Sequence, residues 1–262
     1  EICACLVGSE MCIRDSMDFE KKVCFVTGGG SGIGRAVALE LAKRGAYVAV
    51  GGRTLKKVEQ VAAEMGERGL AIQMDVSSLS DWQQAVKQIH QRFGDIGVVI
   101  NNAGIADQTP LEYLTEEAFR ASMEINMMSV FYSLKTAAED MKKNHWGRIV
   151  NTSSIAGIRA CGDNAVYAAS KHAVDGLTKS AAFALAKYNV LVNCVHPGVV
   201  DTPMMDDVRE KYPEAIAQIC AMIPLKRMCK PEEVAKLIAF LASEDNTFVN
   251  GEGITIDGGQ YA

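Results

Sequence analysis

A tyrosine and a lysine lie four positions apart in a segment with a helical pattern. Tyr167 and Lys171 are at i and i+4, so they share one face of an α-helix. A free tyrosine has a pKa of about 10, too high for proton transfer near neutral pH, but an ammonium group one turn away lowers it. Ser154 follows a strand-like run, where its hydroxyl can donate to a substrate oxygen as charge develops there. The three residues predict acid–base chemistry at a substrate oxygen, although the Tyr-x-x-x-Lys spacing alone also arises by chance.

A glycine-rich turn, TGGGSGIG at 27–34, follows the first strand-like run and leads into a helical pattern. Glycines permit positive φ and let the backbone approach a pyrophosphate, and a helix N-terminus supplies free N–H groups and partial positive charge. The spacing is Gly-x-x-x-Gly-x-Gly, and such a turn can also be purely structural. Its place between the first strand and the first helix favours a dinucleotide site. The predicted cofactor-binding residues of this turn are Gly28, Gly30, Ser31, Gly32, Ile33 and Gly34.

The segment after the second strand indicates which dinucleotide is bound. A dinucleotide fold usually carries an acidic residue about 20 positions on, where it binds the ribose hydroxyls of NAD. Residues 46–57 contain no acid, and Gly52 stands at the expected position, followed by Arg53 and Thr54. A carboxylate repels a 2′-phosphate, whereas a guanidinium pairs with it through two hydrogen bonds. We therefore predict NADP(H), bound at Arg53 and Thr54; the alternative is that Arg53 is a solvated residue at the helix entry.

Strand-like and helical runs alternate along the chain and must position these residues. Strands are expected at 22–27, 47–50, 70–74, 98–101, 148–151, 190–195 and 253–256. Helices are expected at 31–44, 55–68, 80–93, 123–143, 166–188 and 231–243. The alternation predicts an α/β protein with a single-domain Rossmann fold, a doubly wound seven-stranded parallel sheet with helices on both faces.

Two segments stand outside this alternation. Residues 1–16 resemble the in-frame translation of a sequencing adapter, and we interpret them as a non-native N-terminal scar before a single domain at 17–262. Residues 201–230 are the least patterned stretch. We expect a loop there, beyond the carboxyl end of a strand, which acts as a substrate lid.

The composition limits the possible partners. The 262 residues carry 27 Lys and Arg against 32 Asp and Glu, a net charge of −5, which argues against a nucleic-acid-binding protein. No apolar run reaches the length of a membrane span. The cysteines beyond residue 16 are scattered without a Cys-x-x-Cys pair, which predicts reduced thiols and a cytoplasmic location. No His, Asp and Cys cluster has ligand spacing, so we expect no metal, and we expect His196 to be structural.

Five motifs together resemble one protein family. They are TGGGSGIG at 27–34, NNAG at 101–104, SS at 153–154, YAASK at 167–171 and HPG at 196–198. Their order and spacing resemble the short-chain dehydrogenase/reductase family, and more narrowly its classical subfamily, over residues 22–259. Several features are similar to the bacterial 3-oxoacyl reductase and hydroxysteroid dehydrogenase branches.

The resemblance implies roles for individual residues. Tyr167 would be the general acid that protonates a carbonyl oxygen, and Lys171 would lower its pKa and hold the nicotinamide ribose. Ser154 would polarise the substrate carbonyl, and Asn126 would hold a water in the proton relay. The other implied cofactor contacts are Asp75 and Val76 at the adenine, Asn102, Ala103 and Gly104 near the adenosine ribose, and Pro197, Gly198, Val200 and Thr202 at the nicotinamide.

The resemblance also implies the reaction, the reversible NADP(H)-dependent reduction of a ketone to a secondary alcohol. A 3-oxoacyl thioester is our first substrate class. The alternatives are a hydroxysteroid dehydrogenase or another alcohol or sugar dehydrogenase, and a non-catalytic dinucleotide sensor. An acyl carrier protein is acidic and would need a basic docking surface. Its cations would be Lys142, Lys143, Arg148 and Lys187, which equally fit solvated surface charge.

Family members commonly form tetramers through the helix expected at 166–188 and the long helix before it. The apolar face of this helix favours a partner helix, although part of that face must belong to the core. We predict a homotetramer, which a gel-filtration mass of one subunit would contradict.

Overall fold

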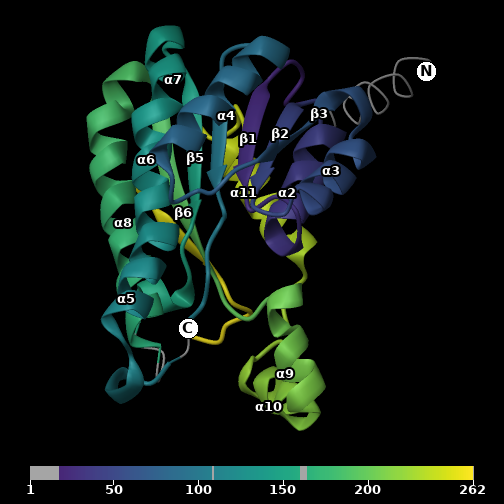
Figure 1. Ribbon diagram of the computed structural model, residues 1–262, viewed down its shortest axis with the longest axis vertical. Coiled ribbons are helices and arrows are strands. Elements are labelled where there is room, and N and C mark those ends of the chain that lie inside the picture. Colours follow the sequence, from purple (N-terminus) through teal and green to yellow (C-terminus); the bar gives the residue numbers. More distant parts are fainter. Residues whose placement is uncertain (1–17, 108, 160–163, 262) are drawn as a thin grey trace, which may run out of the picture.

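The computed structural model describes residues 18–107, 109–159 and 164–261, so the segment 1–16 lies outside the described residues. Seven strands form one parallel sheet in the order β3-β2-β1-β4-β5-β6-β7. The strands are β1 (Val23–Thr27), β2 (Tyr47–Gly52), β3 (Gly69–Gln73), β4 (Val98–Asn101), β5 (Gly147–Thr152), β6 (Val190–Pro197) and β7 (Gly253–Ile256). The chain winds outward in both directions from the adjacent β1 and β4 (Figure 1), which confirms the predicted doubly wound sheet.

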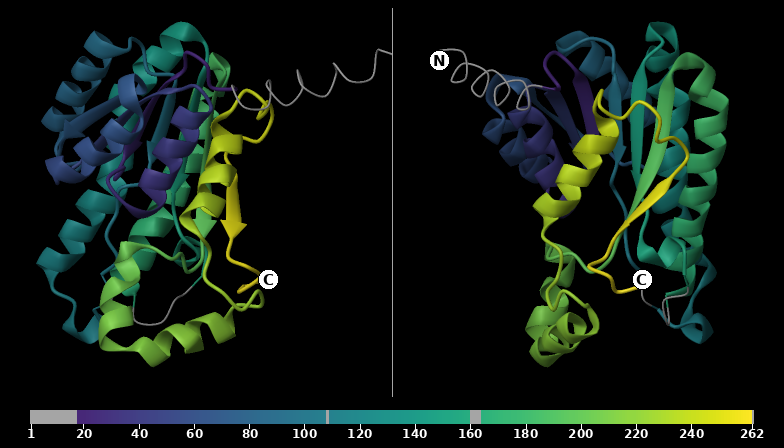
Figure 2. Two further views of the ribbon diagram at one scale, coloured as in Figure 1. Left: turned by 90° about the vertical axis from the view of Figure 1, so that its right-hand side faces the viewer. Right: turned by 180° about the vertical axis from the view of Figure 1, so that it is seen from behind.

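Alternating side chains on the strands supply two apolar faces, and each face is covered by helices. On β1, Cys24 and Val26 belong to one core cluster, whereas Val23 and Phe25 belong to the other. The first cluster includes residues of α2 (Gly32–Lys43), α3 (Leu55–Glu64) and α11 (Pro231–Ala242). The second includes residues of α4 (Leu79–Arg92), α7 (Ala138–Asn144) and α8 (Ala165–Leu185), and Figures 1 and 2 show the two layers. None of the described helices is long and apolar enough to cross a membrane.

The long helix expected at 123–143 is divided. The structure has α5 (Glu116–Met123), a π-helical turn η3 (Glu124–Met128), α6 (Ser129–Thr136) and α7. A π-turn takes an extra residue into one turn and is common at functional sites. Here it turns Asn126 inward, so the helical periodicity indicated the helix but could not locate its interruption.

Residues 201–230 are not the loop we expected. They contain the 3₁₀ turn η6 (Pro203–Met205) and the helices α9 (Asp206–Lys211) and α10 (Pro213–Met222). Proline stands at the start of both η6 and α10, where its fixed φ suits a first helical residue. The segment lies where we placed it, between β6 and α11, and projects from the carboxyl end of the sheet (Figure 1).

Candidate active site

A cleft of about 580 Å³ opens at the carboxyl ends of the strands, beside the point where the strand order reverses. Most of the predicted site residues line this cleft, whereas Gly34, Asp75 and Asn126 do not. Those that line it are Gly28, Gly30, Ser31, Gly32, Ile33, Arg53, Thr54, Val76, Asn102, Ala103, Gly104, Ser154, Tyr167, Lys171, Pro197, Gly198, Val200 and Thr202. The fold therefore brings together residues that are far apart in the sequence.

The glycine turn is built against the end of β4. Gly28 has φ +64°, and a Cβ there would lie 2.9 Å from the Cα of Ala103. The hydroxyl oxygen of Thr27 accepts hydrogen bonds from the backbone N–H groups of Asn102 (3.1 Å) and Ala103 (3.2 Å). A Cβ at Gly34, inside α2, would collide with the carbonyl oxygen of Gly28. Gly34 therefore fixes the position of the turn by packing against the Gly28 carbonyl, on the side of the turn that faces away from the cleft.

The three residues predicted for acid–base chemistry meet at the floor of the cleft. Tyr167 lies in the first turn of α8, and the Nζ of Lys171 is 5.6 Å from the centre of its ring. Lys171 is 4% exposed and donates to the carbonyl oxygen of Thr152 at 2.7 Å. Burial lowers the pKa of Lys171 to about 8, although the charge of Asp175 opposes that fall. Ser154 follows β5, and its oxygen accepts a hydrogen bond from the Ala156 N–H at 3.1 Å, which leaves the hydroxyl proton for a ligand.

Asn126 lies behind this floor, in the π-turn η3. Its amide donates to the carbonyl oxygen of Ile105 (2.9 Å) and the hydroxyl of Ser170 (2.9 Å), and its oxygen accepts from the Ile105 N–H (2.8 Å). A Cβ on Gly104 would lie 3.1 Å from the Asn126 oxygen and 3.4 Å from the Nζ of Lys171. In this structure Asn126 fixes the backbone that separates it from the cleft.

The charged residues of the cleft are all cations. Among its described lining residues there is no Asp or Glu, and the charged ones are Arg53, Lys57 and Lys171. Arg53 and Lys57 lie at the start of α3 and are exposed. Neither has an ion pair within the described chain. The predicted adenine contact Asp75 turns its carboxylate to the Ser77 N–H (2.9 Å) and hydroxyl (2.6 Å), while Val76 lines the cleft.

Several lining residues were missed by the sequence analysis. Lys57 was identifiable as a second cation close in sequence to Arg53, in the first turn of the helix that follows it. Gln260 and Tyr261 carry no motif and reach the cleft only because the chain turns back after β7. The side-chain oxygens of Gln260 and Thr152 are buried there without a hydrogen-bond partner among the described residues. Glycines that admit a pyrophosphate, cations without partners and these unsatisfied oxygens fit a dinucleotide.

The four cations considered for a carrier-protein dock lie elsewhere. Lys142 and Lys143 are in α7 and pair with Glu139 and Asp95, and Lys187 precedes β6. All are near the amino ends of the strands, opposite the cleft (Figure 1). Arg148 is 3% exposed and donates to backbone carbonyl oxygens. The four cations therefore do not border the cleft, because Lys142, Lys143 and Lys187 directly precede β5 and β6 and so lie at the amino ends of those strands, and Arg148 is buried.

The fold and the cleft define a class of protein, the oxidoreductases that bind a nicotinamide dinucleotide at the carboxyl end of a Rossmann sheet. A sequence profile described as enoyl-(acyl carrier protein) reductase matches residues 28–260. The chain is 39% identical to the 3-oxoacyl-(acyl-carrier-protein) reductase of Thermotoga maritima over 248 residues, 93% of this chain and 99% of that protein. It is 36% identical to the cyclohexanol dehydrogenase of Acinetobacter sp. over 247 residues, 93% of this chain and 96% of that protein.

A solved structure agrees with these relatives. The crystal structure of levodione reductase superimposes with a TM-score of 0.88 at 35% identity, covering 92% of this chain and 98% of that one. The chain therefore belongs to the classical short-chain dehydrogenase/reductase family, whose members act on CH–OH and C=O groups.

The packing behind the glycine turn gives a testable prediction. Gly34→Ala should weaken dinucleotide binding on the order of a hundredfold, because the added methyl displaces the turn from the cleft. Gly176→Ala is the matched control, since nothing lies within 4 Å of a Cβ at this exposed position of α8. The measurement is titration of each folded variant with NADPH, followed by cofactor fluorescence. Equal affinities in the two variants would contradict the role given to Gly34.

Proposed function

We propose that this protein reduces a ketone to a secondary alcohol, reversibly, with NADPH as the hydride donor. One observation carries the proposal: Tyr167, Ser154 and Lys171 converge on the floor of the cleft that the glycine turn borders. Bound NADPH supplies the hydride in such a reaction. The protein must therefore orient the ketone, stabilise charge on its oxygen and deliver one proton.

The roles of the three side chains follow from their positions. The Ser154 hydroxyl donates a hydrogen bond to the ketone oxygen and holds the carbonyl toward Tyr167. The Tyr167 hydroxyl gives its proton to that oxygen as negative charge develops there. The Lys171 ammonium, fixed by the Thr152 carbonyl, stabilises the phenolate that remains. Asn126 supports the wall of the cleft through Ile105, and its water-holding role in the relay stays a prediction.

The preference for NADP(H) rests on the charges beside Gly52. Arg53, just before the N-cap of α3, and Lys57, in its first turn, both line the cleft, and a Cβ at Gly30 would lie 3.0 Å from the Cβ of Lys57. A 2′-phosphate here meets two cations and no carboxylate among the described lining residues. Thr54, the N-cap residue of α3, adds a hydroxyl at the same edge.

We propose a 3-oxoacyl thioester as the first substrate class. The relative from Thermotoga maritima is a 3-oxoacyl-(acyl-carrier-protein) reductase, and the lining of the cleft includes apolar side chains that suit an acyl chain. These apolar residues include Ile105, Ile155, Val199, Met204 and Met205. Residues 201–230 supply part of this lining, which supports their role as a substrate lid.

A free ketone is the second candidate, and one observation favours it. The cations that would bind an acidic carrier lie at the opposite end of the sheet. A cyclohexanol dehydrogenase and a levodione reductase are also among the relatives. A neutral ketone needs only the apolar lining residues and the hydroxyls of Ser154 and Tyr167.

The substrate assignment is tested by following cofactor absorbance with four acceptors: a 3-oxoacyl thioester, a cyclic ketone, a keto-steroid and an enoyl thioester. We expect NADPH-dependent turnover of the 3-oxoacyl thioester and none of the enoyl thioester. Turnover of only the cyclic ketone, or of only the keto-steroid, would contradict the thioester and identify the accepted compound as the substrate class. Turnover of only the enoyl thioester, or tight NADPH binding with no turnover of any acceptor, would contradict the proposed reaction.

The cofactor assignment is tested separately at Arg53. Arg53→Ser should lower kcat/KM for NADPH by about 10- to 100-fold, because a charge-assisted hydrogen bond to phosphate contributes about 1.5–3 kcal/mol. The rate with NADH should not fall. Lys56→Ser is the control, since Lys56 is an exposed neighbour on α3 that does not line the cleft. An equal loss with both cofactors would instead indicate a general defect of the site.

We also infer a homotetramer in the cytoplasm. Phe183 on α8 is 90% exposed and Phe131 on α6 is 38% exposed, on helices that cover the same face of the sheet. Large exposed aromatic side chains favour association. The free thiols of Cys24, Cys194, Cys220 and Cys229 support a reducing compartment.

A further inference from the structure

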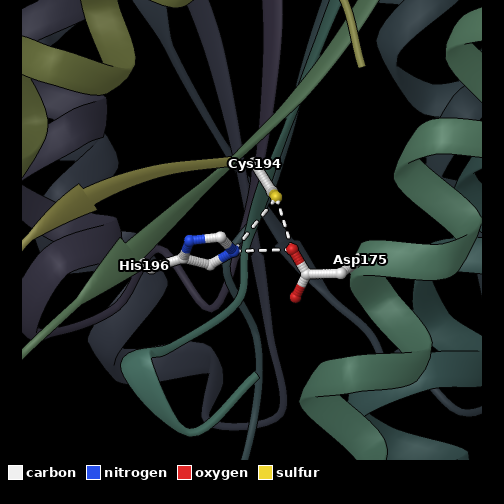
Figure 3. A group of neighbouring side chains, drawn as sticks. All are labelled: Asp175, Cys194 and His196. Atoms are coloured by element: carbon white, nitrogen blue, oxygen red, sulfur yellow. Dashed lines mark hydrogen bonds and ion pairs between the residues drawn. The ribbon is translucent and has the colours of Figure 1, made fainter. Parts of the chain in front are cut away.

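A second group of polar side chains lies behind Lys171, on the side away from the cleft. Asp175 stands one turn after Lys171 on α8, and its carboxylate points toward β6 (Figure 3). Its Oδ1 lies 2.6 Å from the Nε2 of His196 and accepts a hydrogen bond from the Sγ of Cys194 at 3.0 Å. Its Oδ2 accepts a hydrogen bond from the hydroxyl of Ser153 at 2.6 Å. Ser153 lines the cleft, whereas Asp175, Cys194 and His196 do not.

The group is closed on two sides by glycines. A Cβ at Gly157 would lie 2.7 Å from the Oδ2 of Asp175 and would collide with the Ser153 hydroxyl. A Cβ at Gly253, on β7, would collide with the ring of His196. Asp175 is therefore held in one place by its donors and by the backbone that packs against them.

The distances are those of hydrogen bonds. Asp175, Cys194 and His196 offer three potential metal-ligand atoms within 4.8 Å of one another. Two ligand atoms at about 2.0–2.2 Å from a tetrahedral zinc are separated by about 3.4 Å. The 2.6 Å between Asp175 and His196 is too short for that arrangement and fits a shared proton. Burial raises the pKa of Asp175, but the hydrogen bonds from His196, Ser153 and Cys194 and the electrostatic interaction with His196 lower it below its usual range, so the ionised form is favoured.

A buried ammonium needs a compensating charge, because an isolated ion in the interior is strongly unfavourable. The buried carboxylates of the described chain are Asp140 and Asp175, and Asp140 binds His90 near the opposite end of the sheet. Asp175 stands one turn from Lys171 on α8; burial lowers the pKa of Lys171, and the charge of Asp175 raises it. The other groups around Lys171 are Tyr167 on α8, the neutral amide of Asn126 on η3, the Thr152 carbonyl on β5, and Cys194 and His196 on β6.

We propose that Asp175 is the buried counter-ion of Lys171, held ionised by Ser153, Cys194 and His196, and that it is a positioning residue for the acid–base step. The Ser153 hydroxyl joins the two, since it also lies 3.1 Å from the backbone carbonyl oxygen of Lys171. The charge of Asp175 keeps Lys171 protonated at neutral pH, and only a protonated Lys171 stabilises the Tyr167 phenolate. The reactive face of α8 thus depends on a carboxylate that substrate never contacts. This inference rests on the roles proposed above for Tyr167 and Lys171.

The direct test is the titration of Lys171 itself. Lysine labelled with carbon-13 at Cε is observed by NMR as a function of pH, and the Lys171 signal is assigned by its loss in Lys171→Met. All variants carry Tyr167→Phe, which removes a second titrating group beside the ammonium. Asp175→Asn should lower the midpoint of Lys171 by about one pH unit. Cys194→Ser, which changes the same cluster without removing its charge, should leave the midpoint unchanged.

An unchanged midpoint in folded Asp175→Asn would overturn the proposal. If Asp175→Asn is too unstable for this titration, Lys171→Met is added to it and the urea unfolding of the two variants is compared. A counter-ion is no longer needed once the ammonium is gone, so the double variant should unfold at a higher urea concentration than Asp175→Asn. A double variant no more stable than the single one would overturn the proposal equally. Neither measurement uses substrate or cofactor, so its failure is distinguishable from failure of the proposed reaction.

Discussion

The ammonium group of Lys171 lies in the interior, where a positive charge is unfavourable unless the surrounding chain compensates it. The compensation comes from elements that are distant in the sequence. The carbonyl oxygen of Thr152 at the end of β5 accepts a hydrogen bond from the Nζ of Lys171 at 2.7 Å, and Asp175 places a negative charge one turn further along α8. β5, β6 and α8 must therefore be packed together before the Tyr167 hydroxyl can face a substrate.

The charged side chains that line the cleft are unevenly distributed. At the edge near β2, Arg53 and Lys57 offer positive charge without a neighbouring carboxylate among the described lining residues. The other described lining residues carry one charge, that of Lys171, among apolar and uncharged polar side chains. A 2′-phosphate would meet the cations near β2, whereas a ketone would lie beside Ser154 and Tyr167, next to the nicotinamide end of a bound cofactor, as hydride transfer between them requires.

The sequence predicted the fold because hydrophobic periodicity and glycine turns are local signals. All seven expected strands occur, and the residues of the glycine turn except Gly34, together with the Tyr167–Lys171 pair, line one cleft. The failures were features that depend on tertiary packing. The π-turn that directs Asn126 inward leaves the helical pattern almost unchanged. α9 is too short to show a pattern, and α10 buries no residue and so has no apolar face directed at the core. Asp175 resembled an ordinary polar helix residue, because its partners on β6 become neighbours only in the folded sheet.

The central claim is that Tyr167 delivers the proton while the surrounding cleft binds the cofactor and the ketone. Its most direct measurement is single-turnover reduction by Tyr167→Phe, in parallel with NADPH binding to the same preparation. The account predicts unchanged NADPH affinity and a rate of reduction lower by about 10²–10⁴-fold, the usual contribution of a positioned general acid. A Tyr167→Phe protein that binds NADPH and reduces the ketone at the rate of the unmodified chain would contradict it.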